Sequence, residues 1–313
     1  MLRSTSLRRL LTVFLLFSAG LHESSGALQQ VPPTEPPTVT LQVRIEDKQG
    51  SPPPSIAKEM LEATSGKITL PIVSVTPAVE ESLAIGLLLD RSGSRRGAFE
   101  GKAASEEIRL SGQFLETLLR SQDQFFISML VDDEALSSPL SSDKKKIAEL
   151  LAEVERRKPY GSSPLYATIA DAVDRLASAG TERRALLIIT DGGDNASGSN
   201  LQQTINHVLK GKVSLFLIVS YEPNARPRDI RRNLRAAEDL TRQTGGFYLE
   251  VRQPDDLQSA LDRMLNQIRS QFLVTLAYPQ DARRGKPMRI RIRSAEERWK
   301  VHHPESFYPT VGK

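Results

Sequence analysis

Short apolar runs, separated by segments of helical periodicity, constrain the fold of this chain more than any other feature. Continuous apolar runs are typical of strands that are buried on both faces of a parallel sheet. The sequence therefore predicts an α/β domain with a doubly wound, mostly parallel sheet. The predicted strands are residues 83–89, 125–131, 185–190, 213–220 and 247–251.

The segments between these runs have the apolar spacing of crossover helices. Apolar residues recur at intervals of three and four, which places them on one face of a helix. Gly245 and Gly246 are expected to end the third of these helices. The predicted helices cover residues 147–154, 165–176, 230–240 and 257–268.

Alternating patterns predict β structure on both sides of the α/β domain. Residues 39–45 alternate between apolar and polar, and a second strand is expected over 67–75. The stretch 51–65 has room for a short helix, although its prolines disfavour one. Near the other end, residues 272–278 and 288–293 alternate in the same way.

The N-terminus has the pattern of a secretory signal peptide. Arg3, Arg8 and Arg9 precede an apolar run of about a dozen residues, shorter than the ~20 that cross a bilayer. We therefore expect cleavage after Ala27 and a secreted or periplasmic protein, which would contact a membrane only through an uncleaved signal. The expected parts are a signal peptide (1–27), a Pro-rich linker (28–37), an N-terminal β segment (38–80), the α/β domain (81–270) and a C-terminal β segment (271–313).

Composition excludes several chemistries. The absence of cysteine excludes disulfides, thiolate metal sites and cysteine nucleophiles. The 42 Lys and Arg nearly balance the 38 Asp and Glu, and no aromatic residues interleave with basic clusters, so nucleic-acid binding is not expected. Nucleotide binding is not expected either, because residues 97–103 lack the spacing of a phosphate-binding loop.

Polar residues directly follow two of the predicted strands. Asp90, Ser92 and Ser94 follow the first strand in the string LLLDRSGS, and Asp191 follows another in LLIITDGGD. Ligands bind beyond the carboxyl ends of parallel strands, and the loop GSSPLY is expected to bring Ser163 to the same edge. We therefore expect two carboxylates and several hydroxyls to converge there.

A set of oxygen donors without His or Cys suits a hard divalent cation with octahedral geometry, which favours Mg²⁺. The donors do not distinguish Mg²⁺ from Mn²⁺ or Ca²⁺. An EF-hand is excluded, because Gln202 rather than Glu stands at the twelfth position counted from Asp191. Asp194 and Asn195 are expected to shape the second loop.

With these motifs in this order, the chain resembles the von Willebrand factor A (VWA) domains over residues 83–269, and its loops resemble their metal-ion-dependent adhesion site (MIDAS). The resemblance implies a Rossmann-like fold in which Ser92 and Ser94 bind the metal directly. It also implies that Asp90 and Asp191 act directly or through water. Ser163 would replace the family's threonine and lacks the methyl group that restricts the threonine rotamer, so a weaker site is expected.

The flanking strands and the string LVTLAYP resemble secreted bacterial VWFA-related proteins of the acidobacterial type. In that case the β segments before and after the VWA domain would form one small accessory β unit.

These features favour a non-enzymatic binding protein whose metal coordinates an acidic side chain of a protein partner. The loops 95–101 and 194–200 would then select the partner. Two alternatives stay open. A metal-dependent hydrolase would use the same loops, but His207, His302 and His303 stand outside any catalytic motif, and the latter two are expected to be solvated in an edge strand. A structural module without metal is the other, since Asp and Ser commonly cap helices and form turns.

Two groups of arginines have two interpretations. In the first interpretation they are only solvent-exposed basic faces, and on a strand such residues discourage edge pairing. In the second they bind an anionic partner such as a lipid headgroup or an acidic glycan. The groups are Arg226, Arg228, Arg231, Arg232 and Arg235 at a helix start, and Arg289, Arg291 and Arg293 on one strand face.

Overall fold

The computed structural model describes residues 35–95, 102–131, 136–221 and 225–310. The expected signal peptide and most of the expected linker lie outside these residues. The residues from Pro36 onwards belong to one compact unit. Within the described ranges, none of the helices combines the length and the apolar character needed to cross a membrane.

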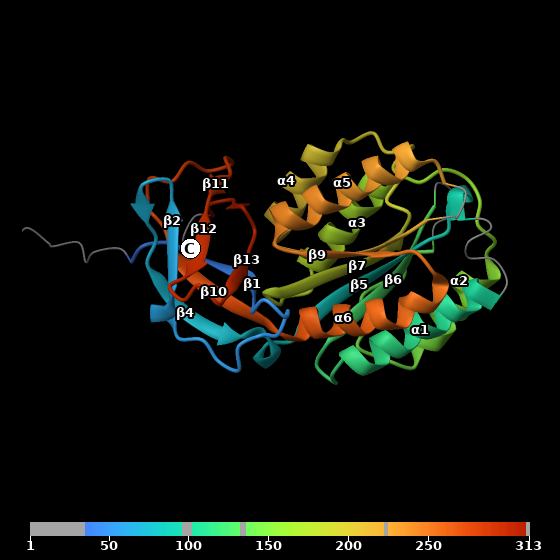
Figure 1. Ribbon diagram of the computed structural model, residues 1–313, viewed down its shortest axis with the longest axis horizontal. Helices are drawn as coiled ribbons and strands as arrows, with labels where there is room; N and C mark the ends of the chain where they lie inside the picture. Colours follow the sequence, from blue (N-terminus) through green and yellow to red (C-terminus); the bar gives the residue numbers. More distant parts are fainter. Residues whose placement is uncertain (1–34, 96–101, 132–135, 222–224, 311–313) are drawn as a thin grey trace, which may run out of the picture. The chain divides into compact units, whose positions relative to one another are not determined.

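A five-stranded parallel sheet with the order β6-β5-β7-β8-β9 forms the α/β domain (Figure 1). Every residue of β5 and β8 is buried, as expected for strands that are covered on both faces. The predicted doubly wound parallel sheet is therefore confirmed. Its strands are β5 (Leu83–Asp90), β6 (Gln124–Leu130), β7 (Arg183–Thr190), β8 (Ser214–Ser220) and β9 (Phe247–Val251).

Six helices cover the two faces of this sheet in the described chain. Helices α1, α2 and α6 cover one face, and α3, α4 and α5 cover the other (Figure 1). Leu87 belongs to the core on the first face and Leu88 to the core on the second. Gly245 ends α5 in the left-handed conformation, with φ of 77°, as predicted. The helices are α1 (Lys102–Leu118), α2 (Lys146–Arg156), α3 (Leu165–Ala177), α4 (Leu201–Gly211), α5 (Pro227–Thr244) and α6 (Leu257–Arg269).

Antiparallel strands from before and after the α/β domain share a third hydrophobic core. The longest pairing joins β1 to β10, and β13 and β4 complete that sheet in the order β13-β1-β10-β4. This is the accessory β unit that the resemblance implied. Its strands are β1 (Thr38–Glu46), β2 (Leu61–Ser65), β3 (Ile68–Thr69), β4 (Ile72–Pro77), β10 (Gln271–Ala277), β11 (Met288–Arg289), β12 (Arg291–Ser294), β13 (Lys300–His302) and β14 (Ser306–Phe307).

Three details of the β unit differ from the sequence predictions. The short helix considered within 51–65 is reduced to one 3-10 turn, Lys58–Met60, and the rest of its C-terminal part is β2, which pairs with β12. The strand expected over 67–75 is split at Leu70 and Pro71, because Leu70 N still donates to Ala63 O of β2, whereas the residues from Ile72 onwards pair with β10. The strand expected over 288–293 is split in the same way at Ile290, which donates to Glu305 O.

The prediction that His302 and His303 are solvated is also wrong. His302 lies in the edge strand β13, but its Nε2 is 2.8 Å from Glu46 Oε1. His303 Nε2 accepts a hydrogen bond of 2.9 Å from Ile292 N. Both rings are therefore held by partners from other strands. The alternation of exposed arginines with buried Ile290 and Ile292 is confirmed.

The Glu46 carboxylate makes the stability of the β unit depend on pH. The hydrogen bond with His302 and the charge of Arg44 lower the pKa of Glu46 from 4.5 to about 2, against the effect of burial. A lowered folded pKa gives stability that is present above about pH 4.5 and is lost as the pH falls towards 2.

We expect Glu46→Gln to remove this acid-dependent part of the free energy of unfolding, as measured by urea denaturation between about pH 4.5 and 2. The control is Glu59→Gln, which changes an exposed carboxylate of the 3-10 turn. Identical acid profiles for the wild type and Glu46→Gln would contradict the prediction.

Candidate functional site

The two predicted carboxylates come from neighbouring strand ends. Asp90 is the last residue of β5, Asp191 directly follows β7, and these strands pair in register up to Leu89 and Ile189. Asp90 is fully buried. Burial and the nearby Asp191 charge raise the pKa of Asp90, and Arg95 opposes them. Asp191 is thus close enough to disfavour the ionised form of Asp90.

Hydrogen bonds from two directions hold the Asp90 carboxylate. Ser92 N donates to Oδ1 at 2.9 Å, and Thr190 Oγ1 donates to Oδ2 at 2.6 Å. Thr190 was not predicted as part of the site, because a threonine at the end of an apolar strand carries no distinctive signal. Thr190 fixes the Asp90 carboxylate, which joins β7 to the loop after β5 (residues 91–95, the first loop).

The first loop brings two predicted hydroxyls together. Ser92 Oγ and Ser94 Oγ are 3.1 Å apart, with Ser92 buried and Ser94 exposed. Gly93 N donates to Gly161 O at 3.0 Å, and a Cβ on Gly93 would lie only 3.1 Å from that oxygen. The close approach of a glycine therefore joins the first loop to the loop that carries Ser163.

The loops of Ser163 and Asp191 are joined in turn. Ser163 Oγ donates to Gly193 O at 2.8 Å, and Gly193 N donates to Asp191 Oδ1 at 2.8 Å. Asn195 Oδ1 accepts from Ser163 N at 2.7 Å, while Asp194 Oδ2 accepts from Tyr166 N at 2.8 Å. Asp194 and Asn195 therefore shape this loop, as expected.

A cavity of about 330 Å³ adjoins three of the five predicted residues. Ser94, Ser163 and Asp191 lie in its wall, whereas buried Asp90 and Ser92 do not. In the described part of the chain, no direct hydrogen bond joins the Asp90 and Ser92 pair to Ser163 or Asp191. Two other interactions connect the buried residues with those of the cavity wall. The Asp191 charge acts on Asp90, and the backbone bond from Gly93 to Gly161 joins the loop of Ser92 to the loop of Ser163.

The donor chemistry is compatible with a hard divalent cation. Within the described residues, no three His, Cys, Asp or Glu side chains gather into a metal-holding group. The predicted set contains only two carboxylates, so hydroxyls and water would complete the coordination. The repulsion between Asp90 and Asp191 is the kind of strain that a dication relieves. Ser163 Oγ donates its proton to Gly193 O, which leaves its lone pairs available to a cation.

A buried ion pair anchors the first loop to the core. Arg95 is at the end of a 3-10 turn, Gly93–Arg95, and its guanidinium contacts Glu107 Oε2 of α1 at 2.5 Å. The same guanidinium donates to Ser220 O and Ser220 Oγ, at 2.8 and 2.6 Å, at the end of β8. Burial raises the pKa of Glu107, and Arg95 opposes that effect.

The expectation that the loop 95–101 selects a partner is therefore wrong for Arg95, whose side chain is buried. Residues 96–101 lie outside the described part. The pair could not be predicted, because Arg95 and Glu107 are twelve positions apart and α1 itself was not predicted.

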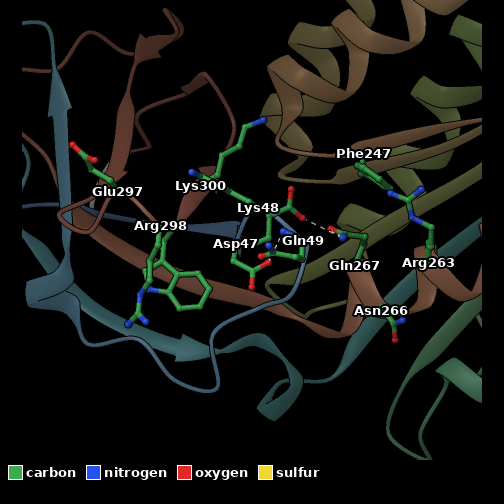
Figure 2. A pocket seen from close by; sticks show the side chains of 13 residues that line it. Asp47, Lys48, Gln49, Phe247, Arg263, Asn266, Gln267, Glu297, Arg298 and Lys300 are labelled. Carbon is green, nitrogen blue, oxygen red and sulfur yellow. Dashed lines mark hydrogen bonds between the residues drawn. The ribbon is translucent and has the colours of Figure 1, made fainter.

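A larger cavity, of about 830 Å³, lies at the turn after β1, beside α6 and the segment 297–300 (Figure 2). It was not predicted. Its lining mixes acidic and basic side chains, and Gln267 Nε2 crosses it to donate to Glu46 Oε2 at 3.3 Å. The Arg298 guanidinium lies 4.9 Å from the ring centre of Trp299, which packs against the core of the β unit. Arg298 and the core of the β unit therefore cover the Trp299 ring, which leaves it unable to stack on a ligand, and we assign no site here.

The sequence matches no protein-family model and no curated protein. Solved structures with similarity include an aerotolerance-related membrane protein from Bacteroides fragilis, at 17% identity over 59% of this chain and 99% of that one, with a TM-score of 0.42. A von Willebrand factor type A protein from Catenulispora acidiphila has 11% identity over 89% and 74%, with a TM-score of 0.48. The PilB minor pilin from Streptococcus sanguinis has 12% identity over 61% and 62%, also at 0.48.

Similarity at these identities concerns the fold alone. The expected doubly wound, Rossmann-like fold is confirmed by the parallel sheet and its two layers of helices.

The buried pair offers a direct test of how the first loop is held. Glu107→Ala would leave the Arg95 guanidinium buried without its counter-charge, and we expect the free energy of unfolding to fall by about 3 to 5 kcal/mol. The control is Glu106→Ala, which breaks a solvent-exposed pair with Arg109 on the same helix and should cost far less, because water screens that pair. Equal losses in the two variants, measured by urea denaturation, would show that the buried pair is not an anchor.

Proposed function

We propose that this chain is an exported, non-enzymatic binding protein whose VWA-like domain holds Mg²⁺ and uses it to coordinate an acidic side chain of a partner protein. The observation that carries the proposal is the pairing of a fully buried carboxylate, Asp90, with Asp191 at the adjacent strand end. Mn²⁺ and Ca²⁺ are the alternative ions. Export rests on the N-terminal pattern, which lies outside the described residues.

Each residue of the proposed site has a defined task. The Ser92 and Ser94 hydroxyls would bind the ion directly, with the Ser163 hydroxyl in the position of the family's threonine. Asp90 and Asp191 would balance its charge, directly or through water. The ion, when bound, would supply a localised positive charge that attracts an anionic oxygen. The bonds from Ser92 N and Thr190 to Asp90 would keep the donors in place before the ion arrives.

The surroundings of the cavity support binding over hydrolysis. A hydrolase would need a general base within reach of its substrate. Among the described residues, none of the histidines lines the cavity, and its three aspartates have other tasks: Asp191 is a proposed ligand, Asp194 accepts from Tyr166 N and Asp229 pairs with Arg232. His207 Nε2 is 2.7 Å from Asp174 on the outer helices, and His302 and His303 are bonded within the β unit. Phosphoester or peptide turnover that is lost in Asp191→Asn would establish the hydrolase instead.

Metal binding is the first test. Millimolar Mg²⁺ should raise the melting temperature of the wild type, because an ion bound only to the folded state stabilises it. We expect Asp191→Ala to weaken Mg²⁺ binding at least tenfold, since changes to groups that merely support metal ligands already cost about 10- to 100-fold. The measurements are thermal unfolding and titration calorimetry with Mg²⁺, Mn²⁺ and Ca²⁺.

The matched control is Asp229→Ala, which removes another carboxylate that lines the same cavity but is not a proposed ligand. It should retain metal binding. A wild type that binds none of the three ions would favour the metal-free structural module.

Partner capture is the second part of the test. A protein partner taken from the native envelope should be retained in Mg²⁺ by the wild type and by Asp229→Ala. It should be lost with chelator and in Asp191→Ala. Retention that ignores both chelator and Asp191→Ala would count against the adhesive role.

A further inference from the structure

The start of α5 forms one wall of the cavity at the candidate metal site. This wall is more basic than a cation site alone would favour, because guanidinium groups beside a divalent cation repel it. The cavity-lining residues of α5 and its cap are Arg226, Asp229, Ile230, Arg232 and Asn233, opposite Ser94, Ser163 and Asp191.

The two arginines of this wall are available to a ligand. Arg226 caps α5, its side chain makes no capping bond, and it is exposed. Among the described residues it forms no ion pair. Arg232 pairs with Asp229 at 3.3 Å and donates to Asn233 Oδ1 at 3.4 Å, but its side chain is 68% exposed, so both contacts are weak and exchangeable.

The wall has a fixed position relative to Asp191. Asn233 Nδ2 donates to the backbone oxygen of Asp191 at 3.0 Å. Further along α5, Ala237 and Leu240 are buried in the core under this face of the sheet. The α5 backbone that carries the two arginines therefore keeps a set position relative to Asp191, while their exposed side chains stay free to adjust to a ligand.

We infer that Arg226 and Arg232 form an anion subsite beside the metal, and that the partner is an acidic protein segment with a second Asp or Glu a few residues from the one that the metal coordinates. This inference rests on the proposed function. A guanidinium accepts a carboxylate through two parallel hydrogen bonds, so each arginine is suited to that second side chain. With the partner bound, its extra negative charge offsets the repulsion between the metal and the wall.

A concave site favours a protein segment over a membrane surface. Only these two arginines of the helix start line the cavity of about 330 Å³. Arg228, Arg231 and Arg235 are exposed on the same helix without lining it. A lipid surface would engage the exposed arginines together, whereas a side chain that enters the cavity would meet Arg226 and Arg232 alone.

The experiment compares two peptides of equal length with uncharged flanks. One carries an Asp and, three residues later, a Glu; in the other, Gln replaces that Glu. Binding to the full chain is measured by fluorescence polarisation in millimolar Mg²⁺ and in EDTA. We expect the wild type to bind the two-acid peptide about fivefold or more tightly in Mg²⁺, the gain of one favourable exposed ion pair.

The variants assign that preference to the cavity wall. Arg226→Gln with Arg232→Gln should abolish the preference and keep the Mg²⁺-dependent binding of the one-acid peptide. Arg228→Gln with Arg235→Gln removes the same charge from the same helix and should keep the preference. Arg226→Gln alone, which leaves the Asp229 pair intact, should reduce it. Unchanged melting temperatures in all three variants exclude unfolding as the cause.

Each other result has a definite meaning. Mg²⁺-dependent binding of both peptides with equal affinity would overturn the subsite and leave the proposed function standing. Equal loss of the preference in both double variants would show a general charge effect and also overturn the subsite. Binding to phosphatidylserine vesicles that depends on Arg226 and Arg232, without a peptide preference, would overturn the acidic-protein assignment. The absence of Mg²⁺-dependent binding to either peptide would overturn the proposed function together with this inference.

Discussion

The need to satisfy one buried carboxylate organises the functional end of this protein. Asp90 is fully buried at the end of β5, where an ionised carboxylate without partners would be very costly. Ser92 N and Thr190 Oγ1 supply its hydrogen bonds, and the Arg95 charge opposes the effect of burial on its pKa. The shape of the first loop follows from these bonds. So does its attachment to β7, whose end carries Asp191.

The same loop is tied to the core on its other side. Arg95 reaches Glu107 on α1 and Ser220 at the end of β8, so one guanidinium connects the loop with a helix and a second strand. Donors that are held this firmly lose little freedom when they bind a ligand, which is the condition for a preorganised site. The proposed ion and the proposed acidic partner would both use this rigidity. The wall of α5, fixed through Asn233, would add selectivity to it.

The elements that could be predicted follow from local sequence patterns. The contacts that were missed join residues far apart in the sequence. Apolar runs and helical spacing identified the five parallel strands and four of the six helices, and strand-end polarity identified Asp90 and Asp191. The break in the strand expected over 67–75 had a local signal in Pro71, but the change of partner from β2 to β10 at that point depends on residues more than 190 positions away. The bonding of His302 was missed because its partner, Glu46, is 256 residues away. No local pattern encodes such contacts.

The sequence by itself determined the α/β fold, the order of the oxygen-bearing loops and the chemistry that those loops offer. Burial and strand-end position follow from the order of apolar and polar residues along the chain, so they can be predicted locally. Only the tertiary structure decided that Arg95 is buried against Glu107 and that Arg226 and Arg232 line the cavity beside Asp191. An arginine can form a buried ion pair, line a cavity or stay in solvent. Which of these it does depends on the elements that pack around it, and that packing exists only in the folded chain.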